Sequence, residues 1–160
     1  MYGGYYNEAI DQLKKIALMD SSYFYAYSHL AFSYTLRGSN KEALQYADKT
    51  LTFVGGIKKD PMTTCLVGWV YAKSGRKDAA EELLKQMEAL YKQTYVDPIH
   101  IAFIYNGLGE KEKAFEYLFK AYEMHSGQII YLNAFGDSYF KDIRSDPRFK
   151  DLLKKIGFKV

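Results

Sequence analysis

Several features that would assign this chain to a particular class of protein are scarce or missing. Cysteine occurs once, at Cys65, so no disulfide can form within the chain, and a reducing, cytoplasmic setting is expected. No apolar run approaches the roughly 18 residues needed to cross a membrane, and the first residues are neither basic nor apolar enough for a signal peptide. The sequence therefore predicts a soluble, cytoplasmic protein with no membrane partner.

A strong charge of one sign is also missing. The chain has 22 basic and 19 acidic residues, a formal net charge of +3, and no run of five like charges. Nucleic-acid binding normally requires basic side chains that cluster on one face. We therefore expect no nucleic-acid partner.

The residue groupings that carry catalysis or bind metals are not found either. None of the three histidines has a His or Glu at metal-ligand spacing, and Cys65 has no second cysteine two residues away. Gly55-Gly56 lacks the Lys-Ser/Thr of a phosphate-binding loop. The sequence thus predicts that the protein is not an enzyme and that it binds neither a metal ion nor a cofactor.

The lone histidines and cysteine have structural interpretations. His29 and His100 both lie nine residues before a glycine, and this equivalence predicts surface positions on helices in preference to a metal site. Cys65 has no basic residue predicted beside it, so we expect a half-exposed, unreactive thiol.

What the sequence does have is a regular spacing of glycine followed five residues later by alanine. Successive pairs are 34, 37 and 34 residues apart, and they are Gly4/Ala9, Gly38/Ala43, Gly75/Ala80 and Gly109/Ala114. Intervals of this size are typical of helical repeats.

Gly38, Gly75 and Gly109 each close a recurring pattern. Four residues before each stands a tyrosine, seven before a small residue and eight before an apolar residue, and these three share one helix face. The glycine is expected to end this first helix, and the alanine of the second helix is expected to meet the small residue. Ser39 and Glu42 have the spacing of a capping box at the start of one such second helix.

This unit resembles the tetratricopeptide repeat, a helix–turn–helix of 34 residues. The matching residues are Tyr27, Leu30, Ala31, Tyr34, Gly38 and Ala43; Val67, Gly68, Trp69, Tyr71, Gly75 and Ala80; and Ile101, Ala102, Tyr105, Gly109 and Ala114. The resemblance implies an all-α, right-handed superhelix of about three and a half repeats with a C-terminal capping helix.

The repeat frame predicts one domain over residues 1–160. Residues 5–19 form a second helix without its first, repeats span 24–57, 61–94 and 95–128, and 129–160 form a cap. The irregular interval places an exposed loop at Gly55-Gly56, with Asp60 capping the next helix. In the cap, Asp146 and Pro147 begin a helix that ends at Gly157.

The orphan helix over residues 5–19 leaves Ala9, Leu13 and Ile16 partly open. We expect that the chain is a fragment cut from a longer array, and the alternative is a natural terminus that dimerises over this edge. Residues 95–160 also resemble the end of the repeat region in multidomain bacterial and archaeal signalling or regulatory proteins. That resemblance implies a regulatory or dimerisation role in cis on a kinase, nucleotide cyclase or DNA-binding domain.

In tetratricopeptide repeats the first helices line a concave surface, and here that surface is predicted to be aromatic. Phe32, Trp69 and Phe103 occupy equivalent positions six residues before successive glycines. The predicted partner-binding residues are Tyr25, Phe32, Met62, Cys65, Trp69, Ile99 and Phe103. Repeat modules that resemble this one and bind acidic C-terminal peptides use Lys, Arg and Asn as a carboxylate clamp, so an acidic C-terminal peptide is not the expected ligand here. The corresponding positions in this sequence are Ser28, Phe32, Leu66, Val96 and His100.

An exposed aromatic row of this kind predicts a non-catalytic interaction module that binds an apolar helix or extended peptide. Three alternatives cover the same row within the protein's own assembly. They are further N-terminal repeats, the C-terminal tail, and a second copy of the chain that docks on the groove or the N-terminal edge.

Overall fold

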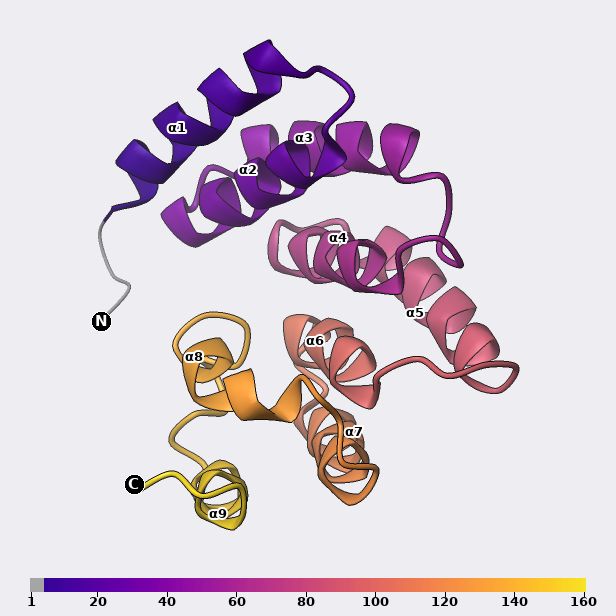
Figure 1. Ribbon diagram of the computed structural model, residues 1–160, viewed down its shortest axis with the longest axis vertical. Helices are drawn as coiled ribbons and strands as arrows, with labels where there is room; N and C mark the ends of the chain where they lie inside the picture. The colour runs from indigo at the N-terminus through magenta and orange to yellow at the C-terminus, as the bar shows by residue number, and fades with distance from the viewer. Residues whose placement is uncertain (1–4) are drawn as a thin grey trace.

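The computed structural model describes residues 5–160, which form nine α-helices joined by short connections (Figure 1). Gly4, the first glycine of the repeating series, lies outside these residues. The helices are α1 (Tyr6–Met19), α2 (Phe24–Arg37), α3 (Asn40–Val54), α4 (Pro61–Lys73), α5 (Lys77–Tyr91), α6 (Pro98–Leu108), α7 (Lys111–Glu123), α8 (Leu132–Gly136) and α9 (Pro147–Lys155). A 3-10 turn over Ile129–Tyr131 precedes α8.

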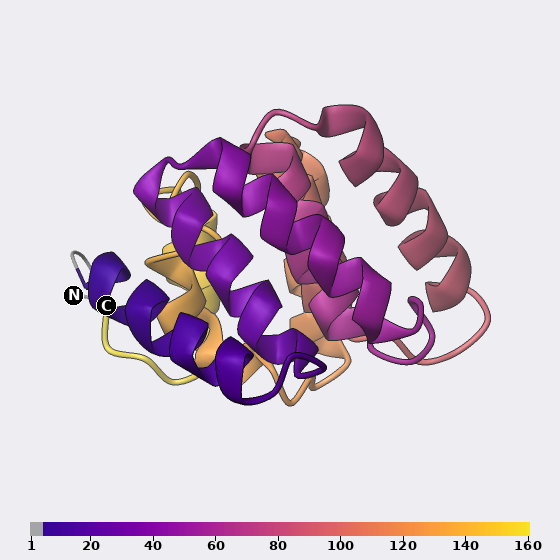
Figure 2. The same cartoon turned by 90° about the horizontal axis from the view of Figure 1, so that it is seen from above.

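The helices pair in chain order and the pairs stack on one another. Helix α2 packs on α3, α4 on α5 and α6 on α7, while α2, α4 and α6 lie side by side as an inner layer. Figures 1 and 2 show that the stack curves, with α8 beside α6 on the inner side of the curve, and α9 packs against α7. The all-α solenoid predicted from the repeat frame is confirmed. The three repeat boundaries stay a prediction, although each segment contains one helix pair.

Three helices begin at an Asp-Pro pair. Asp60 precedes α4, Asp97 precedes α6 and Asp146 precedes α9, and each carboxylate accepts a backbone N–H of the first helical turn. Proline fits at the first helical position because the N–H it lacks would have no partner there. The caps predicted at Asp60 and Asp146 are confirmed, and Asp97 repeats the arrangement.

Glycine ends helices where the repeat frame places it. Gly38 and Gly109 adopt the left-handed conformation, with φ of 82° and 86°, directly after α2 and α6. The capping box predicted at Ser39 and Glu42 is wrong. The Ser39 side chain makes no cap, because its hydroxyl accepts a hydrogen bond from Arg37 Nε at 3.0 Å.

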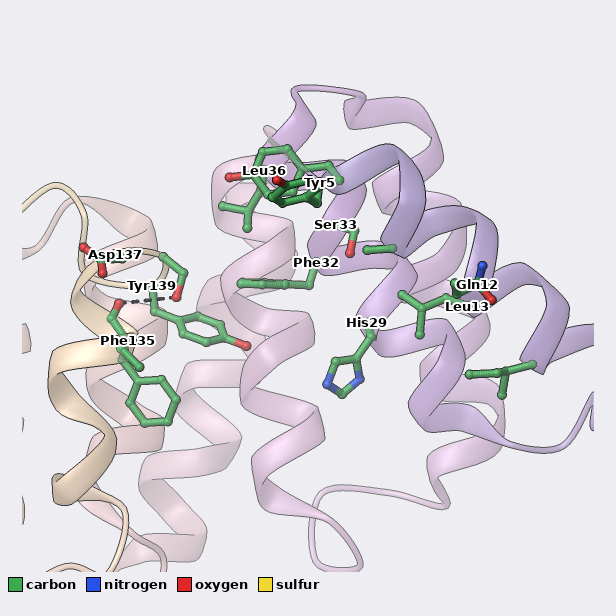
Figure 3. Close-up of a pocket in the computed structure, with 15 residues that line it drawn as sticks. Tyr5, Gln12, Leu13, His29, Phe32, Ser33, Leu36, Phe135, Asp137 and Tyr139 are labelled. Atoms are coloured by element: carbon green, nitrogen blue, oxygen red, sulfur yellow. Dashed lines mark hydrogen bonds between the residues drawn. The ribbon is translucent and has the colours of Figure 1, made fainter. Parts of the chain in front are cut away.

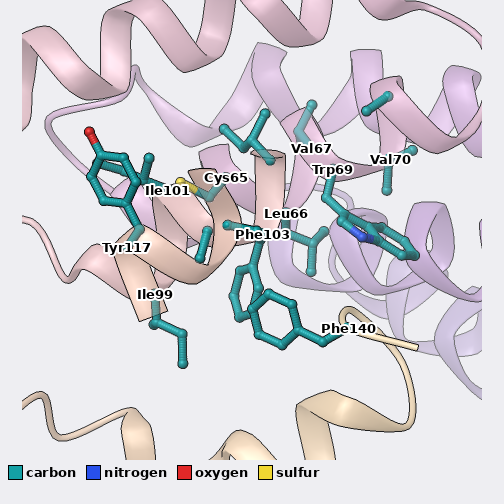
Figure 4. Packing of buried hydrophobic residues seen from close by; sticks show 14 of the residues in the cluster. Cys65, Leu66, Val67, Trp69, Val70, Ile99, Ile101, Phe103, Tyr117 and Phe140 are labelled. Carbon is teal, nitrogen blue, oxygen red and sulfur yellow. The ribbon is translucent and has the colours of Figure 1, made fainter. Parts of the chain in front are cut away.

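The hydrophobic core runs through the inner helices. Helix α4 is buried along almost its whole length, because α5 covers one side while α2, α6 and the C-terminal segment cover the others. Figure 4 shows Phe103 of α6 beside Phe140 of the C-terminal segment, and their rings lie 5.2 Å apart. A helix that is apolar all round in this way is typical of the centre of a layered fold.

The tyrosines of the repeat pattern connect neighbouring pairs. Tyr71 donates a hydrogen bond to Asp48 of α3 at 2.6 Å, and Tyr105 donates to Glu88 of α5 at 2.6 Å. Burial and, after it, the adjacent carboxylate raise the pKa of each phenol, so both hydroxyls remain protonated donors. The pairs α2/α3 and α4/α5 therefore each carry an acceptor for the tyrosine of the next pair.

The C-terminal segment completes the core. Phe140, Ile143, Phe149 and Leu152 are all buried, and the backbone N–H of Phe158 bonds to Leu153 O at the end of α9. The predicted capping role is thus accompanied by extensive apolar burial. Within residues 5–160, none of the helices combines the length and the apolar character that a membrane crossing requires.

Candidate partner-binding groove

The equivalence of Phe32, Trp69 and Phe103 predicted from the sequence holds in space. They project from α2, α4 and α6 toward the concave side, and the rings of Phe32 and Trp69 lie 5.4 Å apart. Equivalent positions on successive stacked helices align in this way because each repeat keeps the same orientation to its neighbour.

The concave side over these rings is occupied by the chain's own C-terminal segment. The ring of Tyr139 stacks on Phe103 at 4.3 Å and on Phe32 at 4.7 Å, and it meets Trp69 edge-on at 5.2 Å. Its backbone carbonyl accepts hydrogen bonds from Trp69 Nε1 at 3.3 Å and Asn106 Nδ2 at 2.6 Å. Tyr139 thus covers the aromatic rings of the predicted groove with its own ring, and its carbonyl accepts the hydrogen bonds of the neighbouring polar groups.

The open groove predicted from the sequence is therefore wrong at four of its seven positions. Cys65, Trp69, Ile99 and Phe103 are at most 2% exposed. The physical reason is that an aromatic row left in water costs free energy, which the tail removes by covering it. Coverage by the C-terminal tail was one of the alternatives left open, and the aromatic spacing of Phe135, Tyr139 and Phe140 is the sequence signal for it.

Two of the remaining predicted residues lie away from the aromatic row. Tyr25 is 41% exposed and Met62 45% exposed, near the beginnings of α2 and α4. The Tyr25 hydroxyl donates a hydrogen bond to Asp60 at 2.8 Å. Only Phe32, which is half-buried, borders both the covered row and open space.

That open space is an apolar pocket of about 600 Å³ between the N-terminal helices and the C-terminal segment (Figure 3). Helix α1 and the residue before it form one wall, α2 the floor and residues 134–139 the opposite wall. The lining residues are Tyr5, Tyr6, Ala9, Gln12, Leu13, Ile16, His29, Phe32, Ser33, Leu36, Ala134, Phe135, Asp137, Ser138 and Tyr139. We call this space the N-terminal groove.

The wall formed by α1 follows helical spacing. Ala9, Leu13 and Ile16 are four and three residues apart, so they share one face of the helix and line the groove. Ala9 is exposed, Leu13 half-buried and Ile16 40% exposed, as the sequence predicts for a helix that lacks its partner. The repeat pattern predicts this open face, whereas its position opposite the C-terminal segment depends on long-range packing that the pattern does not contain.

The N-terminal groove is almost uncharged. Asp137 is its one carboxylate, and it forms an ion pair with Arg144 Nε at 3.1 Å. His29 Nδ1 lies 2.8 Å from the backbone carbonyl of Tyr25. No lysine or arginine lines the groove among the described residues, so it cannot clamp a carboxylate and is suited to apolar groups.

The reactive residue types lie elsewhere. Cys65 is fully buried, not half-exposed as predicted, and burial holds the pKa of its thiol well above the ordinary value. His29 is exposed as predicted, but His100 is only 8% exposed, so its predicted surface position is wrong. In the part of the chain that the structure describes, no three His, Cys, Asp or Glu side chains gather as metal ligands.

Comparison with known proteins gives one family. Residues 25–53, which cover α2 and most of α3, match the family model described as tetratricopeptide repeat. Members of this family are typically non-catalytic scaffold modules that bind other proteins. Neither the curated proteins nor the solved structures give a match to this chain.

Proposed function

This chain carries a tetratricopeptide repeat at residues 25–53 and continues as a helical solenoid, and on that premise we propose that it is a non-catalytic module that binds another protein through the N-terminal groove. The ligand is an amphipathic helix or an extended segment that inserts apolar side chains. The observation that carries this proposal is an open, nearly uncharged groove on the concave side.

The composition of the groove favours apolar contact as the source of affinity. Leu13 and Ile16 on one wall and Phe135 on the other remain partly accessible, so a ligand would remove them from water. Burial of apolar surface contributes about 25 cal/mol per Å² before the costs of association. The few polar groups at the border, such as Gln12 and Ser33, would orient the ligand.

The N-terminal groove, and not the aromatic row predicted from the sequence, is the proposed binding site. Trp69 and Phe103 contribute indirectly, because their rings hold Tyr139 in the wall formed by residues 134–139. Phe32 is the one residue common to the sequence-based site and the N-terminal groove. Direct contact of a partner with Cys65 or Ile99 would require displacement of the residues that bury them.

An alternative function is regulation or dimerisation within a larger assembly. Leu18 and Met19 at the end of α1 are each 86% exposed, which favours contact of this edge with further polypeptide. Sedimentation equilibrium across protein concentration tests the homodimer. A concentration-independent monomer mass would count against it.

The interaction proposal is tested with helical peptides selected by display against the whole chain, with affinities measured by fluorescence anisotropy. Leu13→Glu places a charge in the apolar groove and is expected to weaken binding at least about ten-fold. Leu18→Glu is the matched control, because it makes the same change on the same helix outside the groove.

Circular dichroism should first show that both variants keep their helix content. Equal affinity of the two variants for every selected peptide would contradict the N-terminal groove as the binding site. Loss of binding in both variants would also count against it, since Leu18 does not line the groove.

A further inference from the structure

A second pocket, of about 410 Å³, lies where the N-terminal ends of α4 and α6 meet. The residues that matter for its chemistry are Tyr25, Met62, Tyr95, Asp60, Asp97 and His100. It is separate from the N-terminal groove, because the two pockets have no lining residue in common.

Two carboxylates face this pocket. Asp60 accepts hydrogen bonds from Thr63 N at 2.9 Å, from the Thr63 hydroxyl at 3.0 Å and from the Tyr25 hydroxyl at 2.8 Å. Asp97 accepts from Ile99 N at 3.1 Å and from the Ser126 hydroxyl. All these donors are uncharged, and each carboxylate keeps acceptor capacity for a further partner.

Neither carboxylate forms an ion pair with a basic side chain of residues 5–160. Lys59 borders the same pocket, but its side chain turns toward Gly55 at the end of α3, where its Nζ would lie 3.4 Å from a Cβ placed on that glycine. The pocket therefore holds two negative charges that the described chain leaves without a cation.

A buried imidazole forms part of the same pocket. His100 is only 8% exposed, and neither ring nitrogen has a hydrogen-bond partner within the described residues. Burial outweighs the nearby Asp97 and Asp60 carboxylates and lowers the His100 pKa, so the ring is neutral at pH 7. A neutral ring does not repel a cation and offers it an acceptor nitrogen. Buried polar side chains normally have a partner, so a missing one points to a ligand.

The rim of the pocket is aromatic and apolar. Tyr25 is 41% exposed and Tyr95 is 65% exposed, while Met62 beside them is 45% exposed. Tyrosine faces attract ammonium and guanidinium groups, and methionine packs against alkyl chains. The rim thus suits an alkyl stem and the interior suits its charged end.

We propose that this pocket binds an alkylammonium or guanidinium cation, held by Asp60 and Asp97 with the His100 ring beneath and Tyr25 at the rim. The source is either the lysine or arginine side chain of a bound polypeptide or a free small amine. The proposal is independent of the N-terminal groove, because it rests on a different set of residues.

The test is an NMR titration of the whole chain at pH 7 with n-butylammonium, following the His100 ring and the Ile99 amide. Both resonances should shift with millimolar affinity. 1-Pentanol is the neutral probe of similar size and should bind far more weakly. N-acetyl-lysine N-methylamide tests the peptide source, and its binding at least as tight as n-butylammonium identifies a polypeptide side chain. If n-butylammonium binds and the lysine derivative does not, the natural ligand of the pocket is a free amine.

The variants Asp60→Asn and Asp97→Asn remove charge while asparagine keeps the helix cap. Each should weaken n-butylammonium binding about five-fold or more, and Asp20→Asn, at an exposed site away from the pocket, should leave it unchanged. The proposal is overturned if no shift occurs up to roughly 100 mM, if 1-pentanol binds equally well, or if both pocket variants bind like the unmodified chain.

Discussion

At the scale of single residues, His100 shows how tertiary burial changes the chemistry of a side chain. Its repeat position matches that of His29, which is exposed, yet His100 is 8% exposed and without hydrogen-bond partners in the described chain. The difference follows from the neighbours of the two helices: α6 packs against α4, α5 and α7, whereas His29 on α2 lines the open N-terminal groove.

This burial predicts a specific dependence of stability on pH. The folded pKa of His100 lies below its unfolded value of about 6.5, so the unfolded state binds the proton more readily. The stability that the fold has with a neutral His100 ring is fully present above that unfolded pKa. It is lost as the pH falls toward 5 and the unfolded state takes up the proton. We expect the free energy of unfolding to decrease over this range, by at most about 1.4 kcal/mol per pH unit.

Urea unfolding between pH 7 and 5 measures this effect. His100→Gln should flatten the slope, whereas His29→Gln should retain it, and equal slopes in the two variants would refute the assignment. The carboxyls with lowered pKa act in a separate window below about pH 4.5, and they are Asp20, Glu112, Glu116 and Asp146.

At the scale of helices, the small residue of the repeat pattern has an unexpected neighbour. The sequence predicts that Gly68 of α4 meets the alanine of its own pair, Ala80 of α5. The structure places the nearest side chain on α6, where Ile104 Cδ1 lies 2.8 Å from a Cβ added at Gly68. The glycine therefore sets how closely neighbouring inner helices can approach.

Gly68→Ala is expected to lower the free energy of unfolding by about 1–2 kcal/mol, because the overpacking exceeds the roughly 1 kcal/mol gained in helix propensity. Ile104→Val removes Cδ1 and should recover part of this loss when combined with Gly68→Ala. A double-mutant cycle from urea unfolding measures the coupling. Strictly additive effects would show that the two residues do not compete for space.

At the scale of the whole molecule, the concave side is shared between a filled half and an open half. Residues 135–140 bury the row formed by Trp69 and Phe103, while α1 and α2 keep the N-terminal groove open. Tyr139 belongs to both halves, because it covers the row and lines the groove.

Tyr139→Ala should therefore affect the whole chain. We expect the free energy of unfolding to fall by about 2–3 kcal/mol, since four ring contacts are lost, and the emission of Trp69 to move to longer wavelength as water reaches it. Tyr131→Ala is the matched control at a site that is 53% exposed. Unchanged Trp69 emission in Tyr139→Ala would contradict the covering role.

Residue spacing along the chain is enough to predict the helical repeat, the Asp-Pro helix starts and the equivalence of Phe32, Trp69 and Phe103. All of these features depend on residues close together in the sequence. In a helix, residues three or four apart lie on the same face, so their spacing alone predicts which side chains lie together. The exposed face of α1 was likewise predictable, because its helix has no preceding partner in the pattern.

The accessibility of that surface depends instead on long-range packing. The burial of Trp69 and Phe103 depends on where residues 135–140 return along the solenoid, about 30 residues or more from the helices they cover. Local periodicity carries no information about such a return, since the tail folds where it can bury the most apolar surface. The same long-range contact closed the predicted groove and created the one that remains open.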